Sequence, residues 1–86
     1  MLGTQPNAQL SINLSKMERS VLCCLANGLQ SKEIASEVCR SKPTVELCVR
    51  TLYAKFNAKS RAHLVALALS GGIIGLRDVR PLEMAS

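Results

Sequence analysis

Helix-capping serines and helix-stopping residues divide the chain between residues 15 and 72 into four short segments. The expected caps are Ser15, Ser31, Ser41 and Ser60. The expected stops are Gly28, Asn57 and Gly71-Gly72, because these residue types tolerate the left-handed conformation of a helix end. Glu18 follows Ser15 at the capping-box spacing, and Pro43 fits the first turn of a helix. These signals predict helices over about 15–27, 31–38, 42–56 and 61–70.

Composition indicates an all-α domain with an aliphatic core. Of the 86 residues 48% are hydrophobic, yet the chain has one Phe, one Tyr and no Trp. Leu and Ala, which favour helices, outnumber the β-branched and aromatic residues that favour strands. A chain of this length has room for one core only. We expect a flexible lead-in over 1–13, a domain over 14–76 and a loose tail over 77–86, with Ile73, Ile74 and Leu76 as a short apolar cover.

The third predicted helix has two different faces. Val45, Cys48, Leu52 and Phe56 repeat at helical spacing and form one buried stripe. Its opposite surface carries Glu46, Leu47, Arg50, Thr51 and Ala54. The fourth helix is apolar over much of its circumference, and such a helix on a small domain requires a second partner surface.

The positive charge is concentrated in one window. The formal net charge is +5, and residues 40–61 alone carry six cations against Glu46. The six cations are Arg40, Lys42, Arg50, Lys55, Lys59 and Arg61. A concentrated positive field favours a polyanion such as nucleic acid, or an anionic membrane surface, although a solvated basic face is the plainer interpretation.

Four cysteines and a single histidine exclude several site types. Cys23, Cys24, Cys39 and Cys48 include no C-x-x-C pair, so neither a metal site nor a disulfide framework is expected. Four reduced structural thiols indicate a cytoplasmic protein. No signal peptide precedes residue 14, and the apolar stretch from Leu64 is too short to span a membrane. No nucleophile–base set and no phosphate-binding glycine loop is present, so we expect no enzyme and no cofactor.

The second and third predicted helices form a helix-turn-helix candidate, joined by Cys39-Arg40-Ser41. The motifs that carry a family resemblance are Leu14-Ser15-x-x-Glu18-x-x-Val21-Leu22, Ala26-x-Gly28, Lys32-Glu33-Ile34-Ala35, Ser41-x-x-Thr44-Val45, Lys55-Phe56 and Ser60-Arg61-Ala62. Over about residues 14–74 the chain resembles the LuxR/GerE-type helix-turn-helix DNA-binding domain. The resemblance implies a four-helix domain that binds operator DNA as a dimer, with the third helix in the major groove and the fourth at the dimer contact. Its length resembles that of the family's stand-alone members.

These considerations assign roles to individual residues. Glu46, Leu47 and Arg50 are expected to read bases, Arg50 at a guanine edge and Leu47 at a thymine methyl. The expected phosphate contacts are Ser31, Lys32, Lys42, Thr44, Thr51, Lys55 and Arg61. The expected dimer contacts on the fourth helix are His63, Leu64, Leu67, Ala68 and Gly71. A capping role is the alternative for Ser31. For Thr44 a capping role and a phosphate contact can coexist. A solvated charge is the alternative for Arg61 and for each lysine.

Two functions remain open at this point. The first is a sequence-specific DNA-binding transcriptional regulator that acts as a homodimer in a bacterial cytoplasm. The second is a small antagonist that pairs with a full-length regulator of the family and blocks it. Glu46 favours the second function if its carboxylate repels phosphates, and the first if it accepts a hydrogen bond from cytosine N4. Besides double-stranded DNA, another LuxR-type regulator and RNA polymerase are the partners open to the chain, and no membrane partner is expected.

Overall fold

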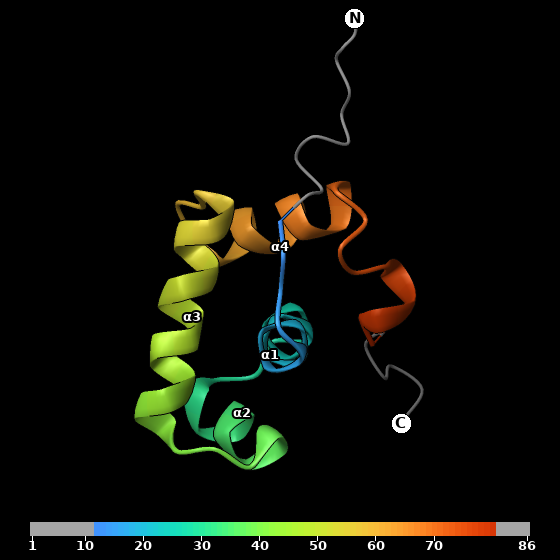
Figure 1. Cartoon of the computed structure of the whole chain (residues 1–86). Helices are drawn as coiled ribbons and strands as arrows, with labels where there is room; N and C mark the ends of the chain where they lie inside the picture. The colour runs from blue at the N-terminus through green and yellow to red at the C-terminus, as the bar shows by residue number, and fades with distance from the viewer. Residues whose placement is uncertain (1–11, 81–86) are drawn as a thin grey trace, which may run out of the picture.

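The computed structural model describes residues 12–80 and contains four α-helices followed by one 3-10 turn (Figure 1). The elements are α1 (Lys16–Ala26), α2 (Ser31–Val38), α3 (Lys42–Phe56), α4 (Arg61–Ser70) and η2 (Leu76–Asp78). No strand occurs within 12–80, so the expected all-α class is confirmed. The bounds of α2, α3 and α4 agree with the sequence prediction, and α1 is one residue shorter at each end.

Side chains fix where each helix begins. Ser15 and Glu18 form a reciprocal capping box: the Glu18 amide donates to Ser15 Oγ at 3.0 Å and the Ser15 amide to Glu18 Oε1 at 2.9 Å. Ser60 Oγ accepts from the His63 amide at 3.0 Å. The expectation for Ser31 is wrong. Ser31 is already helical, and the cap position is Gln30, whose amide donates to Glu33 Oε1 at 2.8 Å.

Left-handed residues end α2 and α3. Cys39 has φ 56° and Asn57 has φ 54°, and each follows directly on the last helical residue. Asparagine adopts this conformation readily, whereas a cysteine there is uncommon because its Cβ crowds the backbone. Gly28 and Gly72, at φ 83° and 76°, turn the chain after α1 and α4.

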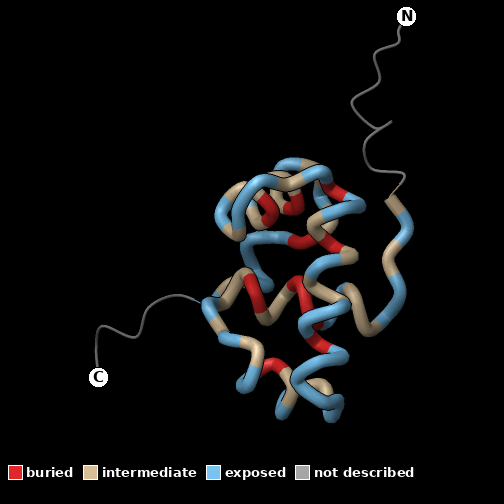
Figure 2. Tube along the Cα trace, turned by 90° about the vertical axis from the view of Figure 1, so that its left-hand side faces the viewer, coloured by how far each residue is buried: buried red, intermediate tan, exposed pale blue. Residues whose placement is uncertain are grey.

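The core is formed where α1 meets the other three helices. Its buried residues are Val21, Leu22, Leu25, Ile34, Val45, Leu52, Phe56, Leu64, Ala68 and Ile74. Helix α1 packs against α2, α3 and α4, and it lies at the middle of the bundle (Figure 1). The buried positions of each helix face inward, and the outer turns are exposed (Figure 2). No side chain that the structure describes buries an unpaired polar atom.

The segment after α4 closes over α1. Ile74 is only 2% exposed and belongs to the core, whereas Leu76 is 78% exposed, so the expectation that Leu76 covers the core is wrong. Asn27 holds the end of this segment, because its Nδ2 donates to the Asp78 carbonyl at 2.8 Å and its Oδ1 accepts from the Arg80 amide at 2.6 Å. Residues 77–80 of the expected tail are therefore tied to α1. The remainder of that tail, 81–86, and residues 1–11 of the lead-in lie outside the described residues.

Candidate nucleic-acid interface

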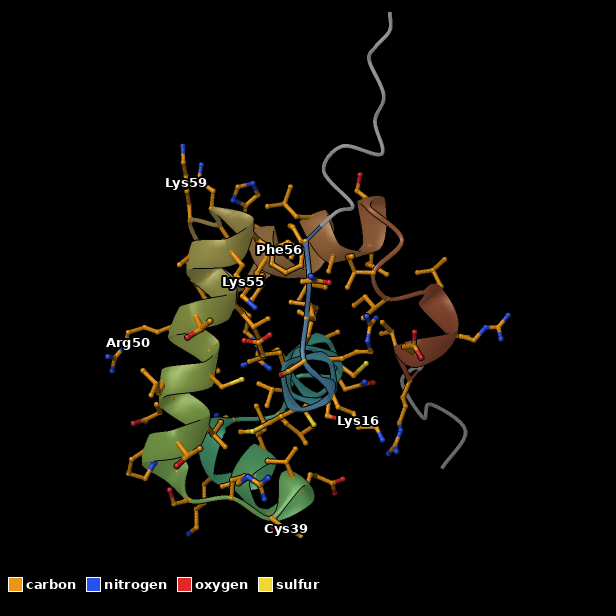
Figure 3. All side chains as sticks on the ribbon, viewed as in Figure 1. Lys16, Cys39, Arg50, Lys55, Phe56 and Lys59 are labelled. Atoms are coloured by element: carbon orange, nitrogen blue, oxygen red, sulfur yellow. The ribbon has the colours of Figure 1, made fainter. Side chains whose placement is uncertain are left out.

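Helix α3 has one face in the core and the opposite face in solvent. Val45 and Leu52 are fully buried and Phe56 is 9% exposed, which confirms the predicted inner stripe. Leu47 is 59% exposed, and Glu46 and Arg50 are exposed beside it. Arg50 extends away from the bundle (Figure 3). The three predicted base-reading residues thus lie together on the outer side of a helix that the core holds from within.

The turn between α2 and α3 fixes how α3 starts. Cys39 closes α2 through its left-handed backbone, and the Arg40 amide donates to the Ala35 carbonyl at 3.0 Å. Ser41 Oγ then accepts from the Thr44 amide at 3.3 Å and donates to Thr44 Oγ1 at 2.9 Å. The Thr44 hydroxyl is exposed, so it is also accessible to an external group. The sequence predicts that a capping role and a phosphate contact can coexist at Thr44, and in the structure the capping hydroxyl is that of Ser41.

Five of the six cations of the basic window lie exposed at the surface, and of these five only Lys55 is in a salt bridge. Arg40, Lys42, Arg50 and Lys59 form no salt bridge within 12–80. Arg50 and Lys59 point outward from α3 and from the α3–α4 turn (Figure 3). These side chains, unlike the other two cations of the window, are available to a polyanion.

Lys55 pairs with an acidic group of the domain. Its Nζ lies 2.8 Å from Glu18 Oε1 and donates to the Asn13 carbonyl at 2.9 Å. The hydrogen bond from Lys55, together with the Ser15 amide, lowers the pKa of Glu18 from its ordinary value of 4.5. Lys55 therefore joins the end of α3 to the start of α1.

Arg61 points inward, against its predicted role. Its Nε and Nη2 donate to the Leu25 carbonyl at 3.1 and 2.7 Å, and Nη2 donates to the Leu29 carbonyl at 2.7 Å. These carbonyls lie at and just beyond the end of α1, where helix carbonyls lack partners. The guanidinium thus caps α1, and a phosphate would have to displace these bonds.

The other predicted phosphate contacts differ in exposure and in whether their donor groups are already hydrogen-bonded. Thr51 Oγ1 donates to the Leu47 carbonyl at 3.1 Å, so its hydroxyl proton is used within α3. Ser31 is half-buried in the first turn of α2, while Lys32 beside it is exposed. Lys42 is exposed in the first turn of α3. The structure therefore places Lys32, Lys42 and Thr44 at accessible helix starts.

Two of the five predicted dimer contacts on α4 lie in the core. Leu64 and Ala68 are fully buried in the core of the same chain, so neither can contact a partner without opening that core. His63, Leu67 and Gly71 are half-buried, and His63 Nδ1 accepts from the Lys59 amide at 3.0 Å. The exposed line of α4 consists of Ala62, Ala66 and Ser70, at four-residue intervals. The spacing of α4 already places Ala66 off the core stripe, but none of these three residues is among the predicted contacts.

The cysteines form no metal site within the part of the chain that is described. No group of three or more His, Cys, Asp or Glu side chains lies close enough to hold a metal ion there. The four thiols are unbridged. Burial raises the pKa of the Cys23, Cys24 and Cys48 thiols, which keeps them protonated at neutral pH.

A four-helix bundle with a short α2–α3 turn and an exposed, partly basic α3 defines a helix-turn-helix nucleic-acid-binding domain. The family model of the bacterial regulatory proteins of the luxR family matches residues 12–68. The chain belongs to that family, and its helix-turn-helix makes it a DNA-binding regulatory domain and not an enzyme.

The chain is also similar in sequence to curated proteins named as transcriptional regulatory proteins. The chain is 41% identical over 84 residues to the transcriptional regulatory protein FixJ of Azorhizobium caulinodans, covering 92% of this chain and 40% of that protein. It is 46% identical over 59 residues to FixJ of Rhizobium meliloti, covering 69% of this chain and 29% of that protein. The protein YdfI of Bacillus subtilis, also a transcriptional regulatory protein, is 38% identical over 61 residues, with 71% and 29% covered. The chain thus spans less than half the length of these relatives.

No solved structure matches the chain significantly. Among the described residues, no helix has the length and apolar character that crossing a membrane requires.

Proposed function

We propose that this chain is a transcriptional regulator that binds operator DNA sequence-specifically, as a homodimer, with α3 in the major groove. The observation that carries the proposal is the outer face of α3. It presents Arg50 and the 59% exposed Leu47 directly opposite a stripe that is locked in the core. A major groove about 12 Å wide admits a helix held in this way. The relatives named as transcriptional regulatory proteins support the same role.

Within this proposal the contacts divide into two kinds. Arg50 donates to a guanine edge, and Glu46 accepts from cytosine N4 on the flank of the same face. Lys42, Thr44 and Lys32 hold phosphates at the starts of α3 and α2, together with the first-turn residue Ser31. We assign no phosphate contact to Lys55, Arg61 or Thr51, because each of these side chains already donates a hydrogen bond within the domain.

For the dimer we propose a contact through α4. The exposed line Ala62, Ala66 and Ser70 allows close helix approach, with His63, Leu67 and Gly71 at its border. Two copies related by a two-fold axis then present two α3 helices to half-sites about one helical turn of DNA apart, or a multiple of it. We also infer a cytoplasmic location, from the reduced state expected of the four cysteines.

The DNA-binding proposal is tested by selecting bound sequences from a random duplex pool, followed by titration of the selected duplex across a salt series. A regulator enriches a two-fold-related sequence, and its binding constant falls steeply with salt, by about 0.9 log units per log unit of salt for each phosphate contact. Lys42→Ala should reduce this slope by about one contact, whereas Arg77→Ala, an exposed arginine on η2, should leave it unchanged. If no duplex binds at low salt, the proposal fails and the antagonist function is favoured.

The dimer proposal needs a separate measurement. Ala66→Glu places a charge at the centre of the exposed line of α4 and should give a monomer in sedimentation equilibrium. Ser36→Glu, on the exposed side of α2, is the matched control and should leave the association state unchanged. A dimer that survives Ala66→Glu would place the interface elsewhere.

A further inference from the structure

An open hollow of about 380 Å³ lies between α1 and the end of α2. Its lining includes Lys16, Met17, Cys24, Glu37, Val38 and Arg40, and we call it the α1–α2 hollow. None of the residues of α3, all of which the structure describes, lines this hollow. Lys16 lies on the side of α1 that faces away from α3 and Arg50 (Figure 3). A molecule in the hollow and DNA against α3 can therefore be bound at the same time.

The floor of the α1–α2 hollow is apolar. Met17, Cys24 and Val38 form it and are half-buried, whereas the charged side chains around them are exposed. Methionine adapts its shape to different apolar partners and is frequent at surfaces that bind them. An apolar centre within a polar rim is the usual anatomy of a protein–protein interface. A small-molecule site encloses most of its ligand, which an exposed rim does not do, so the hollow favours a side chain presented by another protein.

The rim of the hollow is mainly positive. It contains the cations Lys16 and Arg40 and one acid among its described residues, Glu37. Arg80 adds positive charge beside the floor: burial raises the pKa of the Cys24 thiol, and the nearby Arg80 guanidinium partly opposes that shift. None of the three cations forms a salt bridge with a described residue, and none has a role in the proposed DNA contacts. Unpaired positive charge around an apolar floor complements an apolar side chain flanked by carboxylates.

We propose that the α1–α2 hollow is a docking site for an acidic, partly apolar segment of a partner protein. A leucine, methionine or phenylalanine side chain of that segment enters the hollow, and aspartate or glutamate residues beside it pair with Lys16 and Arg40. A nucleic acid or a free anion would use the cations but gain nothing from the apolar floor. The site is separate from the proposed DNA contacts, so it gives the domain a second surface that stays open while α3 is on DNA.

Selection of a random twelve-residue peptide library on the full chain tests this proposal. Enriched peptides should carry a large apolar residue with Asp or Glu close beside it, and the best of them is titrated by fluorescence anisotropy. Lys16→Glu and Arg40→Glu should each weaken its binding about five-fold, because each reversal replaces an attraction by a repulsion. Glu37→Gln should strengthen binding about two-fold, because it removes an acid from the rim. A variant that merely disturbed the fold would not gain affinity.

Lys59→Glu is the matched control, since it makes the same change of charge at an exposed cation between α3 and α4 and should leave the peptide affinity unchanged. Methyl chemical shifts locate the bound peptide: those of Met17 and Val38 should move and those of Leu47 should not. The proposal is overturned if no acidic, apolar peptide is enriched, if Lys59→Glu weakens binding as much as Lys16→Glu does, or if the shifts fall on α3. These measurements use no duplex, so their failure is distinct from a failure of DNA binding.

Discussion

Lys55 Nζ lies 2.8 Å from Glu18 Oε1 and joins the last turn of α3 to the first turn of α1. The Glu18 carboxylate is also the capping-box acceptor of α1, so one acidic group serves two helices. Since α3 is the helix proposed to enter the groove, this pair orients it relative to the central helix of the bundle. The charge of Lys55 therefore stabilises the packing of α3 against α1.

Stability should fall in acid partly through Glu18. Its pKa in the folded state is lowered, chiefly by the hydrogen bond from Lys55. A carboxylate with a lowered folded pKa adds stability above its unfolded pKa and loses that contribution as the pH falls through the folded value. We expect the free energy of unfolding to drop below about pH 4.5, and to drop less in Glu18→Gln. Urea unfolding at pH 7 and pH 3.5, followed by circular dichroism, gives the free energy of unfolding of the parent chain and of Glu18→Gln. An equal drop in the two proteins would contradict the prediction.

Arg61→Lys should destabilise the domain without altering its electrostatic contact with DNA. Lysine cannot reproduce the forked bonds to the Leu25 and Leu29 carbonyls, and we expect the free energy of unfolding to fall by about 1–3 kcal/mol. Lys59→Ala, an exposed cation of the same window, should change it by less than about 0.5 kcal/mol. Urea titrations give these differences. If the DNA-binding constant of Arg61→Ala depended less on salt concentration than that of the parent chain, Arg61 would contact a phosphate, as the sequence predicts.

Arg50→Ala should weaken binding to the selected operator by about 1–3 kcal/mol and relax specificity at one base pair. The reason is the loss of a bidentate contact with guanine, which carries sequence information. Affinities for the operator and for single-base variants, measured at one salt concentration, reveal the change. An equal loss on every sequence would instead identify Arg50 as a phosphate contact.

Cys39→Gly should stabilise the domain. The left-handed backbone at φ 56° strains a cysteine, and glycine removes that strain at some cost in unfolded-state entropy. A net gain of about 0.5–1 kcal/mol in the free energy of unfolding is expected. Cys39→Ala is the matched control, because it removes the thiol and keeps the strain. Equal stabilities of the two variants would show that the backbone at this position is unstrained.

The thiols should react with Ellman's reagent in two phases. Cys39 is exposed, whereas Cys23, Cys24 and Cys48 are half-buried and have raised pKa values. One thiol per chain should therefore react quickly at neutral pH and three slowly. If the fast phase is absent in Cys39→Ala, it belongs to Cys39. A fast phase that persists in this variant would contradict the prediction.

Local signals predicted the helices well because they act over a few residues. Ser41, Pro43 and Asn57 decide the bounds of α3 within their own turns, and Ser60 does the same at the start of α4. The outer face of α3 followed from the spacing of its buried stripe. Ser31 was misplaced as a cap because the preceding glutamine, a less common choice, occupies that position.

Contacts between distant residues could not be predicted in the same way. Arg61 and Lys55 find partners 36 and 37 residues away, and no local pattern distinguishes a bonded cation from a free one. Leu64 and Ala68 are different, because their spacing on α4 already indicates a core stripe and the structure buries both, so it is their second assignment, to the dimer contact, that conflicts with the structure. The base, phosphate and dimer roles of the individual residues remain predictions.

The buried Ile74 and the bonds of Asn27 to residues 78 and 80 give the domain a folding unit longer than the stretch that the family model matches. A chain cut after residue 68 would keep all the residues of α2 and α3 but lose a core side chain and the closure over α1. These ties join residues more than 50 positions apart in the chain, so they close a long loop at a cost in entropy. Truncation within residues 69–80 should therefore loosen α3, the helix proposed to enter the groove, because α3 shares the core with Ile74.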